Sequence, residues 1–222
     1  MGFLTDLLFP PRCALCGRPG GERSAPCRSC RADAALWLTG PDAVRRGAAC
    51  SLCVCAGAYR GVLRDSVRRF KFLGHPEYAQ VYGPILAEPI RRTLAGRYDT
   101  IAWMPVSAGT LATRGYDQAR LLAEETAAAL GDHARPLLRK VRDTAAQSSL
   151  GSAGARWVNV AGVYAVLDQE TIRGRRILLI DDILTTGATL EEGARTLRAA
   201  GAAEVVAATL CRAMPRTHSE PS

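Results

Sequence analysis

The chain has 222 residues, of which 48% are hydrophobic, and a formal net charge of +8. That length accommodates one α/β domain and a small additional module. No apolar run approaches the ~20 residues of a membrane-spanning helix, and no basic leader precedes the first apolar stretch. We therefore expect a cytoplasmic protein without a membrane span. The charge suits a polyanionic partner, but the basic residues are scattered in pairs, so charge alone selects no function.

Residues 1–56 are a candidate zinc-knuckle module, too short for a hydrophobic core of its own. Two Cys-x-x-Cys pairs, Cys13 with Cys16 and Cys27 with Cys30, supply four thiols. Together they complete the tetrahedral ligand set that Zn²⁺ prefers. A thioredoxin-like redox pair is the alternative, but it calls for a strand before the motif and a helix after it. The spacing therefore predicts a structural zinc site.

Three further cysteines follow at Cys50, Cys53 and Cys55, with no fourth cysteine nearby. A degenerate second knuckle, buried thiols and a supplementary site are all compatible with this spacing. We assign no metal to them.

From Tyr59 onward the pattern changes to alternating helices and strands, so we expect a second domain over residues 57–213. The expected helices are 67–72, 78–94, 118–130 (capped by Asp117) and 190–200, and the expected strands are 100–104, 163–167, 177–180 and 204–210. Such alternation predicts an α/β fold with a mostly parallel sheet, closed by the last strand, and a ligand site at the carboxyl ends of the strands. We expect residues 142–155 to be a mobile loop and residues 214–222 a disordered tail.

The most informative segment runs from Ile177 to Thr189. A short aliphatic strand ends in two carboxylates, Asp181 and Asp182, and a small-residue loop and a helix follow. Backbone N–H groups of such a loop and helix start can hold a phosphate, and hydroxyl side chains add donors. The loop comprises Thr185, Thr186, Gly187, Ala188 and Thr189. The two carboxylates are better suited to ribose hydroxyls or a magnesium ion than to the phosphate.

Other phosphate motifs fit this segment less well. A P-loop requires Gly-Lys-Ser/Thr, and no lysine follows Gly187. No Gly-x-Gly-x-x-Gly follows a predicted strand. An ordinary α/β connection remains open as an interpretation, since Thr189 and Glu192 have the spacing of a capping box.

The segment resembles the phosphoribosyl-diphosphate (PRPP) signature of the type I phosphoribosyltransferases. Nearly the whole chain resembles the ComF family, the family of competence protein F. Four blocks carry this second resemblance: the residues leading to Cys13-x-x-Cys16, the run Arg114-Gly115-Tyr116-Asp117-Gln118-Ala119, the run Arg142-x-Thr144-x-x-Gln147 continuing to Arg156-x-x-Asn159, and the PRPP signature itself.

The resemblance implies a zinc module fused to a type I phosphoribosyltransferase-like domain that acts in natural competence and DNA uptake. It implies ribosyl transfer from PRPP with Mg²⁺, through an oxocarbenium-like transition state. Asp181 and Asp182 would bind the ribose, and residues 185–189 the 5′-phosphate. Arg114 and Arg142 would face the pyrophosphate. Implied partners are PRPP or a related sugar phosphate, single-stranded DNA and proteins of the competence machinery.

Two other functions remain open. One is a single-stranded nucleic-acid-binding adaptor with a sensory or vestigial PRPP pocket; the other is a metabolic phosphoribosyltransferase whose zinc module serves assembly. Several residues also have structural interpretations. Arg114 could bridge to the next helix through Asp117 or Glu124, and Lys71 is expected to be an exposed lysine. Residues 106–113 lack the arginines often found at this place in the family.

Overall fold

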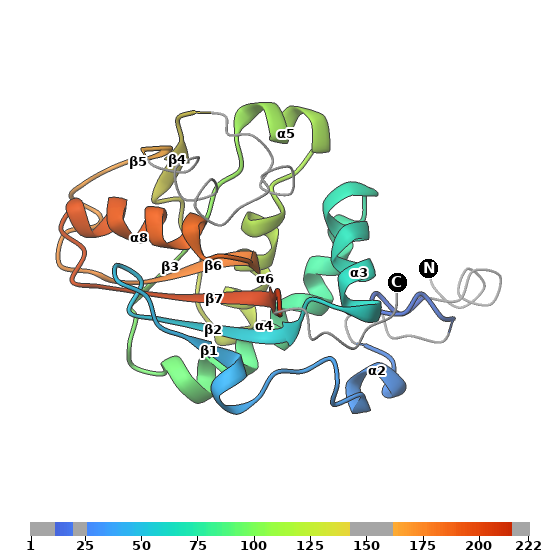
Figure 1. The fold of residues 1–222 in the computed structure, drawn as a ribbon. Coiled ribbons are helices and arrows are strands. Elements are labelled where there is room, and N and C mark those ends of the chain that lie inside the picture. Colours follow the sequence, from blue (N-terminus) through green and yellow to red (C-terminus); the bar gives the residue numbers. More distant parts are fainter. Residues whose placement is uncertain (1–11, 20–25, 143–161, 215–222) are drawn as a thin grey trace.

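The computed structural model describes residues 12–19, 26–142 and 162–214 (Figure 1). In chain order, the elements are α2 (Arg28–Ala32), η1 (Gly40–Ala43), β1 (Val44–Arg45), β2 (Leu52–Ala58), α3 (Gly61–Phe72), η2 (Pro76–Tyr78), α4 (Ala79–Leu94), β3 (Thr100–Trp103), α5 (Ala108–Arg114), α6 (Gln118–Leu130), β4 (Leu138–Lys140), β5 (Tyr164–Val166), β6 (Arg176–Leu184), α8 (Ala188–Ala199) and β7 (Glu204–Arg212). Within these ranges, no helix combines the length and the apolarity that crossing a membrane demands.

The expected mostly parallel sheet is confirmed. Its five strands follow the order β1-β2-β7-β6-β3. The contacts of β2 with β7, β7 with β6 and β6 with β3 are parallel, and the short edge strand β1 is antiparallel to β2. The prediction that the last strand closes the sheet is wrong. β7 lies in the interior because β2 pairs along its far side.

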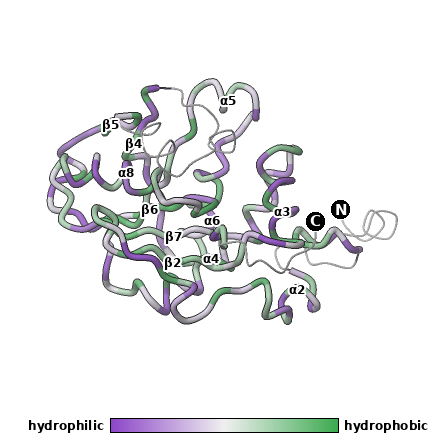
Figure 2. Tube along the Cα trace, viewed as in Figure 1, coloured by the Kyte–Doolittle hydropathy of each residue, from purple (hydrophilic) through white to green (hydrophobic). Residues whose placement is uncertain are grey.

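Helices cover both faces of this sheet. Leu190, Ala194 and Leu197 of α8 pack in one buried cluster with alternate residues of β6 and β7. Residues of α4 and α6 form the second cluster with the other face of the same strands. The central parts of β2, β6 and β7 are mainly apolar because a parallel sheet is buried on both sides, and Figure 2 shows the hydrophobic residues along β2.

The agreement with the expected elements is best where a local signal marks the boundary. Helix α6 begins after Asp117, whose Oδ1 accepts hydrogen bonds from the N–H groups of Ala119 at 3.0 Å and Arg120 at 3.1 Å. This cap was expected and is confirmed. The strand expected at 163–167 exists as β5, but it pairs with β4 in a separate two-stranded sheet.

Several elements were not predicted, among them strands β1, β2 and β4 and helices α2 and α5. Strand β2 carries Cys53 and Cys55 in the main sheet. Helix α5 follows β3, with its first turn capped by the Ser107 side chain. Helix α3 begins at Gly61, six residues before the expected start at 67.

The first Cys-x-x-Cys turn is attached to helix α3. The hydroxyl of Ser66 donates to the carbonyl of Ala14 at 2.5 Å, and Nη2 of Arg69 donates to the carbonyl of Leu15 at 2.7 Å. Figure 1 shows α3 at the end of the sheet to which the parallel strands point. The cysteine module is therefore joined to a helix that lies at the carboxyl ends of the strands.

Candidate functional site

The four predicted zinc ligands lie together. The Sγ atoms of Cys13, Cys16, Cys27 and Cys30 are all within 4.8 Å of one another. Sγ of Cys16 lies 3.7 Å from Sγ of Cys27, close to the ~3.8 Å edge of a tetrahedron whose Zn–S bonds are about 2.3 Å. Zn²⁺ therefore fits the center of this cluster with four thiolate ligands, and we describe it as a structural zinc site.

The thiols of this cluster also have unequal environments. A backbone hydrogen bond from Cys30 is the largest cause that lowers the pKa of Cys27, to about 7. Burial is the largest cause that raises the pKa of the Cys30 thiol. Such crowding of thiols is relieved when a bound cation holds them as thiolates.

The second cysteine group does not form such a cluster. In the described ranges, Cys50, Cys53 and Cys55 join no metal-binding group, and all three are buried. Burial raises the pKa of Cys50 to about 12, and the Thr209 hydroxyl donates to Sγ of Cys55 at 3.2 Å. Of the three interpretations left open, buried thiols agree best with these contacts, since all three cysteines belong to one hydrophobic cluster.

The Asp pair lies inside strand β6, which continues to Leu184. The expectation that the strand ends in the two carboxylates is therefore wrong, because β6 keeps its pairing with β7 through Leu184. Successive residues of a strand point to opposite faces. Asp181 and Asp182 therefore have different surroundings. Asp182 is buried, with a side-chain exposure of 5%, whereas Asp181 is half-buried.

Asp181 is in an unfavourable place for a lone carboxylate. Burial is the largest cause that raises its pKa to about 8; the charge of Asp182 raises it further, and Lys71 partly opposes both. A cation or a pair of hydroxyl donors would favour the ionised form. The chemistry of this position therefore suits a magnesium ion or the hydroxyl groups of a sugar.

Asp182 already has a cationic partner. Nζ of Lys71 lies 3.1 Å from Oδ1 and 3.0 Å from Oδ2 of Asp182. The Lys71 side chain is only 19% exposed, so the expectation of an exposed lysine is wrong. The reason is tertiary: the last turn of α3 lies beside β6, and a buried carboxylate there requires a partner.

The phosphate-type loop has the backbone geometry that its glycine suggested. Gly187 has φ of +85°, which glycine adopts without strain. Arg45 of β1 lies against it, since a Cβ at Gly187 would be 3.0 Å from Nη1 of Arg45. The same nitrogen donates to the carbonyl of Thr185 at 3.4 Å. Arg45 thus adds a positive charge beside this loop, which no local motif indicated.

The capping-box interpretation of this segment does not agree with the structure. The N-cap of α8 is Gly187, without a side-chain cap. The carboxylate of Glu192 instead accepts from the N–H of Gly162 at 2.6 Å and pairs with Arg195. Within the loop, the Thr186 hydroxyl accepts from the N–H of Ala188 at 3.4 Å.

A cavity of about 570 Å³ lies between the end of α3, helix α5 and strand β4. Three cationic side chains line it: Lys71, Arg114 and Lys140. Arg114 also donates to Oε1 of Gln118, and its guanidinium lies 5.2 Å from the center of the exposed Phe72 ring. The bridge from Arg114 to the next helix therefore exists, but through Gln118 rather than Asp117 or Glu124.

The structure brings together only part of the predicted set. Asp181 and Asp182 lie near the end of β6, and the loop residues 185–189 follow that strand directly. Arg114 lines the neighbouring cavity. Arg142 is exposed just after β4, which ends at Lys140. The remaining parts of the third block, at Thr144, Gln147, Arg156 and Asn159, lie outside the described residues. So do most of the expected mobile loop and the tail after Met214.

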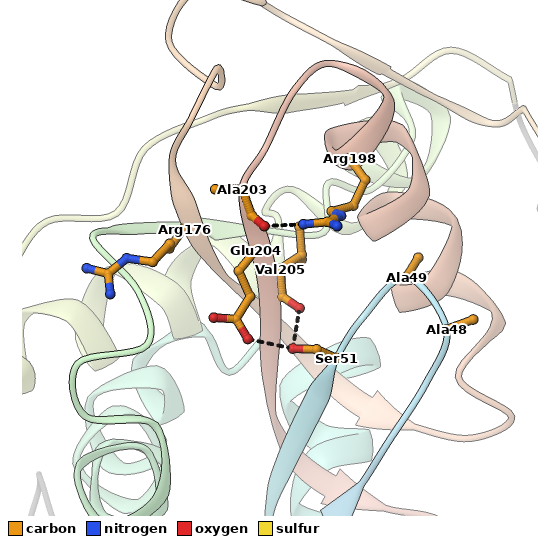
Figure 3. A pocket seen from close by; sticks show the side chains of 8 residues that line it. All are labelled: Ala48, Ala49, Ser51, Arg176, Arg198, Ala203, Glu204 and Val205. Carbon is orange, nitrogen blue, oxygen red and sulfur yellow. Dashed lines mark hydrogen bonds between the residues drawn. The ribbon is translucent and has the colours of Figure 1, made fainter.

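A second cavity, of about 430 Å³, lies at the opposite end of the sheet, where β6 and β7 begin (Figure 3). Its polar groups bind one another. The Ser51 hydroxyl donates to Glu204 at 2.8 Å, Arg97 pairs with Glu204, and Arg198 donates to the carbonyl of Ala203. Because ligand sites of parallel sheets lie at the carboxyl ends, we treat this network as structural.

Comparisons with known proteins match two parts of the chain. Residues 83–220 match the model of the phosphoribosyl transferase domain, and residues 4–53 match that of the double zinc ribbon domain. A DNA utilization protein, YhgH, of Salmonella typhi is 28% identical over 91% of this chain and 84% of that protein. Competence protein ComFC of Bacillus subtilis is 29% identical over 90% of this chain and 77% of that protein.

A solved structure of the allosteric regulatory enzyme of purine biosynthesis is 23% identical over 58% of this chain, with a TM-score of 0.36. The aligned part spans 24% of that longer chain.

Proposed function

The chain belongs to the phosphoribosyl transferase domain family, in the ComF group that carries an N-terminal zinc module, and from this we propose that it binds PRPP with Mg²⁺ and transfers the ribosyl group. The observation that carries the proposal is the pair Asp181–Asp182 followed by the Gly187 loop at the carboxyl end of β6. A carboxylate for sugar hydroxyls and a backbone loop for a phosphate lie at one end of one strand.

Each part of the ligand has a counterpart in this arrangement. Residues 185–189 cradle the 5′-phosphate, with Arg45 adding charge beside the loop. The ribose hydroxyls bind at the Asp pair, where Asp181 is the more accessible carboxylate. Arg114, and Arg142 beyond β4, face the pyrophosphate. Bound Mg²⁺ would offset charge on the pyrophosphate as it leaves, and the half-buried carboxylate of Asp181 fits such a cation.

In the reaction, the bond from the anomeric carbon to the pyrophosphate oxygen breaks as the acceptor attacks that carbon. The chain's contribution is to position the ribose and to stabilise charge, since an oxocarbenium-like transition state needs no covalent nucleophile. The test is release of pyrophosphate from PRPP by the purified chain with candidate base or nucleotide acceptors. Release that Asp181→Asn abolishes supports the proposal; no release with any acceptor contradicts the transferase activity.

The names of the relatives suggest the setting. We propose that the protein acts in natural competence and in the use of incoming DNA. These are the roles that the names of its relatives, competence protein ComFC and the DNA utilization proteins, express.

The second candidate function is a single-stranded nucleic-acid-binding adaptor. It is favoured by Phe72, which is 65% exposed beside the Arg114 guanidinium. Aromatic platforms with cations are typical of such proteins. Affinity for a single-stranded oligonucleotide that falls steeply with salt, and falls again in Phe72→Ser, supports this candidate.

A further inference from the structure

Lysine is rare in this chain and occurs only beside the proposed site. Of the 29 basic Lys and Arg residues, 27 are arginines, and the two lysines are Lys71 and Lys140. They are 69 positions apart, on α3 and β4, yet both line the same cavity of about 570 Å³. All the other Lys and Arg positions hold arginine, and the two lysines line one cavity.

The two basic side chains differ in a way that suits this place. A lysine ammonium is a compact charge with three rotatable donors, whereas the arginine guanidinium is a planar fork. A compact ammonium group can approach phosphate oxygens from the wall of the cavity. Among the described residues that line the cavity, none carries a carboxylate, and Arg114 adds a third positive charge. The cavity is therefore suited to a polyanion.

Lys71 is held in a defined position by its partner. Its Nζ contacts both carboxylate oxygens of Asp182, at 3.1 Å and 3.0 Å, and the Asp182 side chain is 5% exposed. The ammonium keeps one or more donor directions for a ligand because three hydrogens are available. Asp182 thus orients a cation at the edge of the cavity next to Asp181.

We propose that Lys71 and Lys140 form a two-lysine clamp for the diphosphate of the ligand, with Asp182 as the residue that positions Lys71. This inference rests on the proposed function and deepens it. The clamp accounts for the missing arginines at 106–113, since the positive charge comes instead from α3 and β4. Lys71 also precedes residue 83, where the match to the phosphoribosyl transferase domain begins. That part of the site is supplied by the N-terminal region.

The test compares two ligands that differ only in the diphosphate: PRPP and ribose 5-phosphate, each titrated with Mg²⁺ into the full chain. Wild type should bind PRPP more tightly. Lys71→Met and Lys140→Met should each lose about tenfold or more in PRPP affinity, the value of a charge-assisted hydrogen bond, while ribose 5-phosphate affinity stays within about twofold. Lys71→Arg should recover part of the loss. Arg64→Met removes an exposed charge from the same helix and should change neither affinity.

A second measurement needs no variant. With only two lysines, acetylation by acetic anhydride followed by mass spectrometry reports each ammonium group separately in the native chain. Pyrophosphate should protect both lysines, and ribose 5-phosphate should protect neither. Equal labelling with and without pyrophosphate, or an unchanged ratio of the two affinities in both Lys→Met variants, overturns the clamp alone. Wild type that binds neither PRPP nor ribose 5-phosphate overturns the proposed function, and the clamp with it.

Discussion

The ammonium group of Lys71 lies 3.0 Å from Oδ2 of Asp182, although 111 positions of sequence separate the two residues. The contact joins helix α3 to the Asp-Asp segment of β6, and the same helix holds the first cysteine turn through Ser66 and Arg69. The zinc module, α3 and the proposed sugar site are therefore connected by direct hydrogen bonds and one ion pair.

This ion pair should contribute measurably to stability. Lys71→Met leaves the Asp182 carboxylate buried without its cation, so the free energy of unfolding should fall by about 3–5 kcal/mol. The double variant Lys71→Met/Asp182→Asn should recover much of that loss, because it removes the uncompensated charge. Urea denaturation followed by circular dichroism measures both. A single variant as stable as wild type would show that the pair is not coupled in solution.

Asp181 should make stability depend on pH. Its pKa is raised from 3.8 to about 8, chiefly by burial. Because the pKa of Asp181 is higher in the folded chain, the folded state binds the proton of this carboxyl more tightly than the unfolded state does. The stabilisation by the protonated carboxyl is therefore complete below the unfolded pKa and is lost as the pH rises through about 8. Asp181→Asn removes the effect. The variant should gain stability relative to wild type as the pH rises from about 4 to about 8, in urea titrations at several pH values; a constant difference would contradict the shifted pKa.

The zinc site can be tested by composition. Cys13→Ser removes one of four thiolates and should release the metal, since structural zinc in small peptides contributes about 10–16 kcal/mol to folding. Metal analysis of the purified variant checks this. Cys50→Ser is the matched control because Cys50 is a buried cysteine outside the cluster. Equal zinc content in wild type and Cys13→Ser would refute the four-thiolate site.

The contact of α4 with α6 depends on a glycine. A Cβ at Gly83 would lie 2.5 Å from the backbone carbon of Glu125, so any side chain there must push the helices apart. Gly83→Ala should lower the free energy of unfolding by about 1–3 kcal/mol despite the higher helix propensity of alanine. Glu88→Ala, at an exposed position of the same helix, should change it little. A stabilised Gly83→Ala would show that the crossing is looser than described.

What could be predicted from the sequence depended on how local the signal is. Helix α6 was bounded correctly because Asp117 caps it and Gly131, with φ of +77°, ends it. The four zinc ligands were identified because Cys-x-x-Cys spacing is itself the structural requirement. The Gly187 loop belongs to the same group, since its residues follow one another along the chain.

The elements that were missed depend on contacts between distant segments. Strand β2 contains Cys53, Cys55 and small residues, a composition that resembled part of the metal module, and its position follows from pairing with β7. Arg45 and Lys71 reach the proposed site from β1 and α3. No spacing rule connects them to Gly187 or Asp182, so only the folded arrangement reveals them.

The most direct test of the central claim is calorimetric titration of PRPP with Mg²⁺ into the full-length chain, beside the Asp181→Asn/Asp182→Asn variant. Zinc content and thermal unfolding of the variant serve as its folding controls. A saturable binding isotherm in wild type that the variant loses, while it retains zinc and a cooperative unfolding transition, is the result we predict. Absence of binding in wild type, or equal binding in the variant, would contradict a PRPP site at the end of β6.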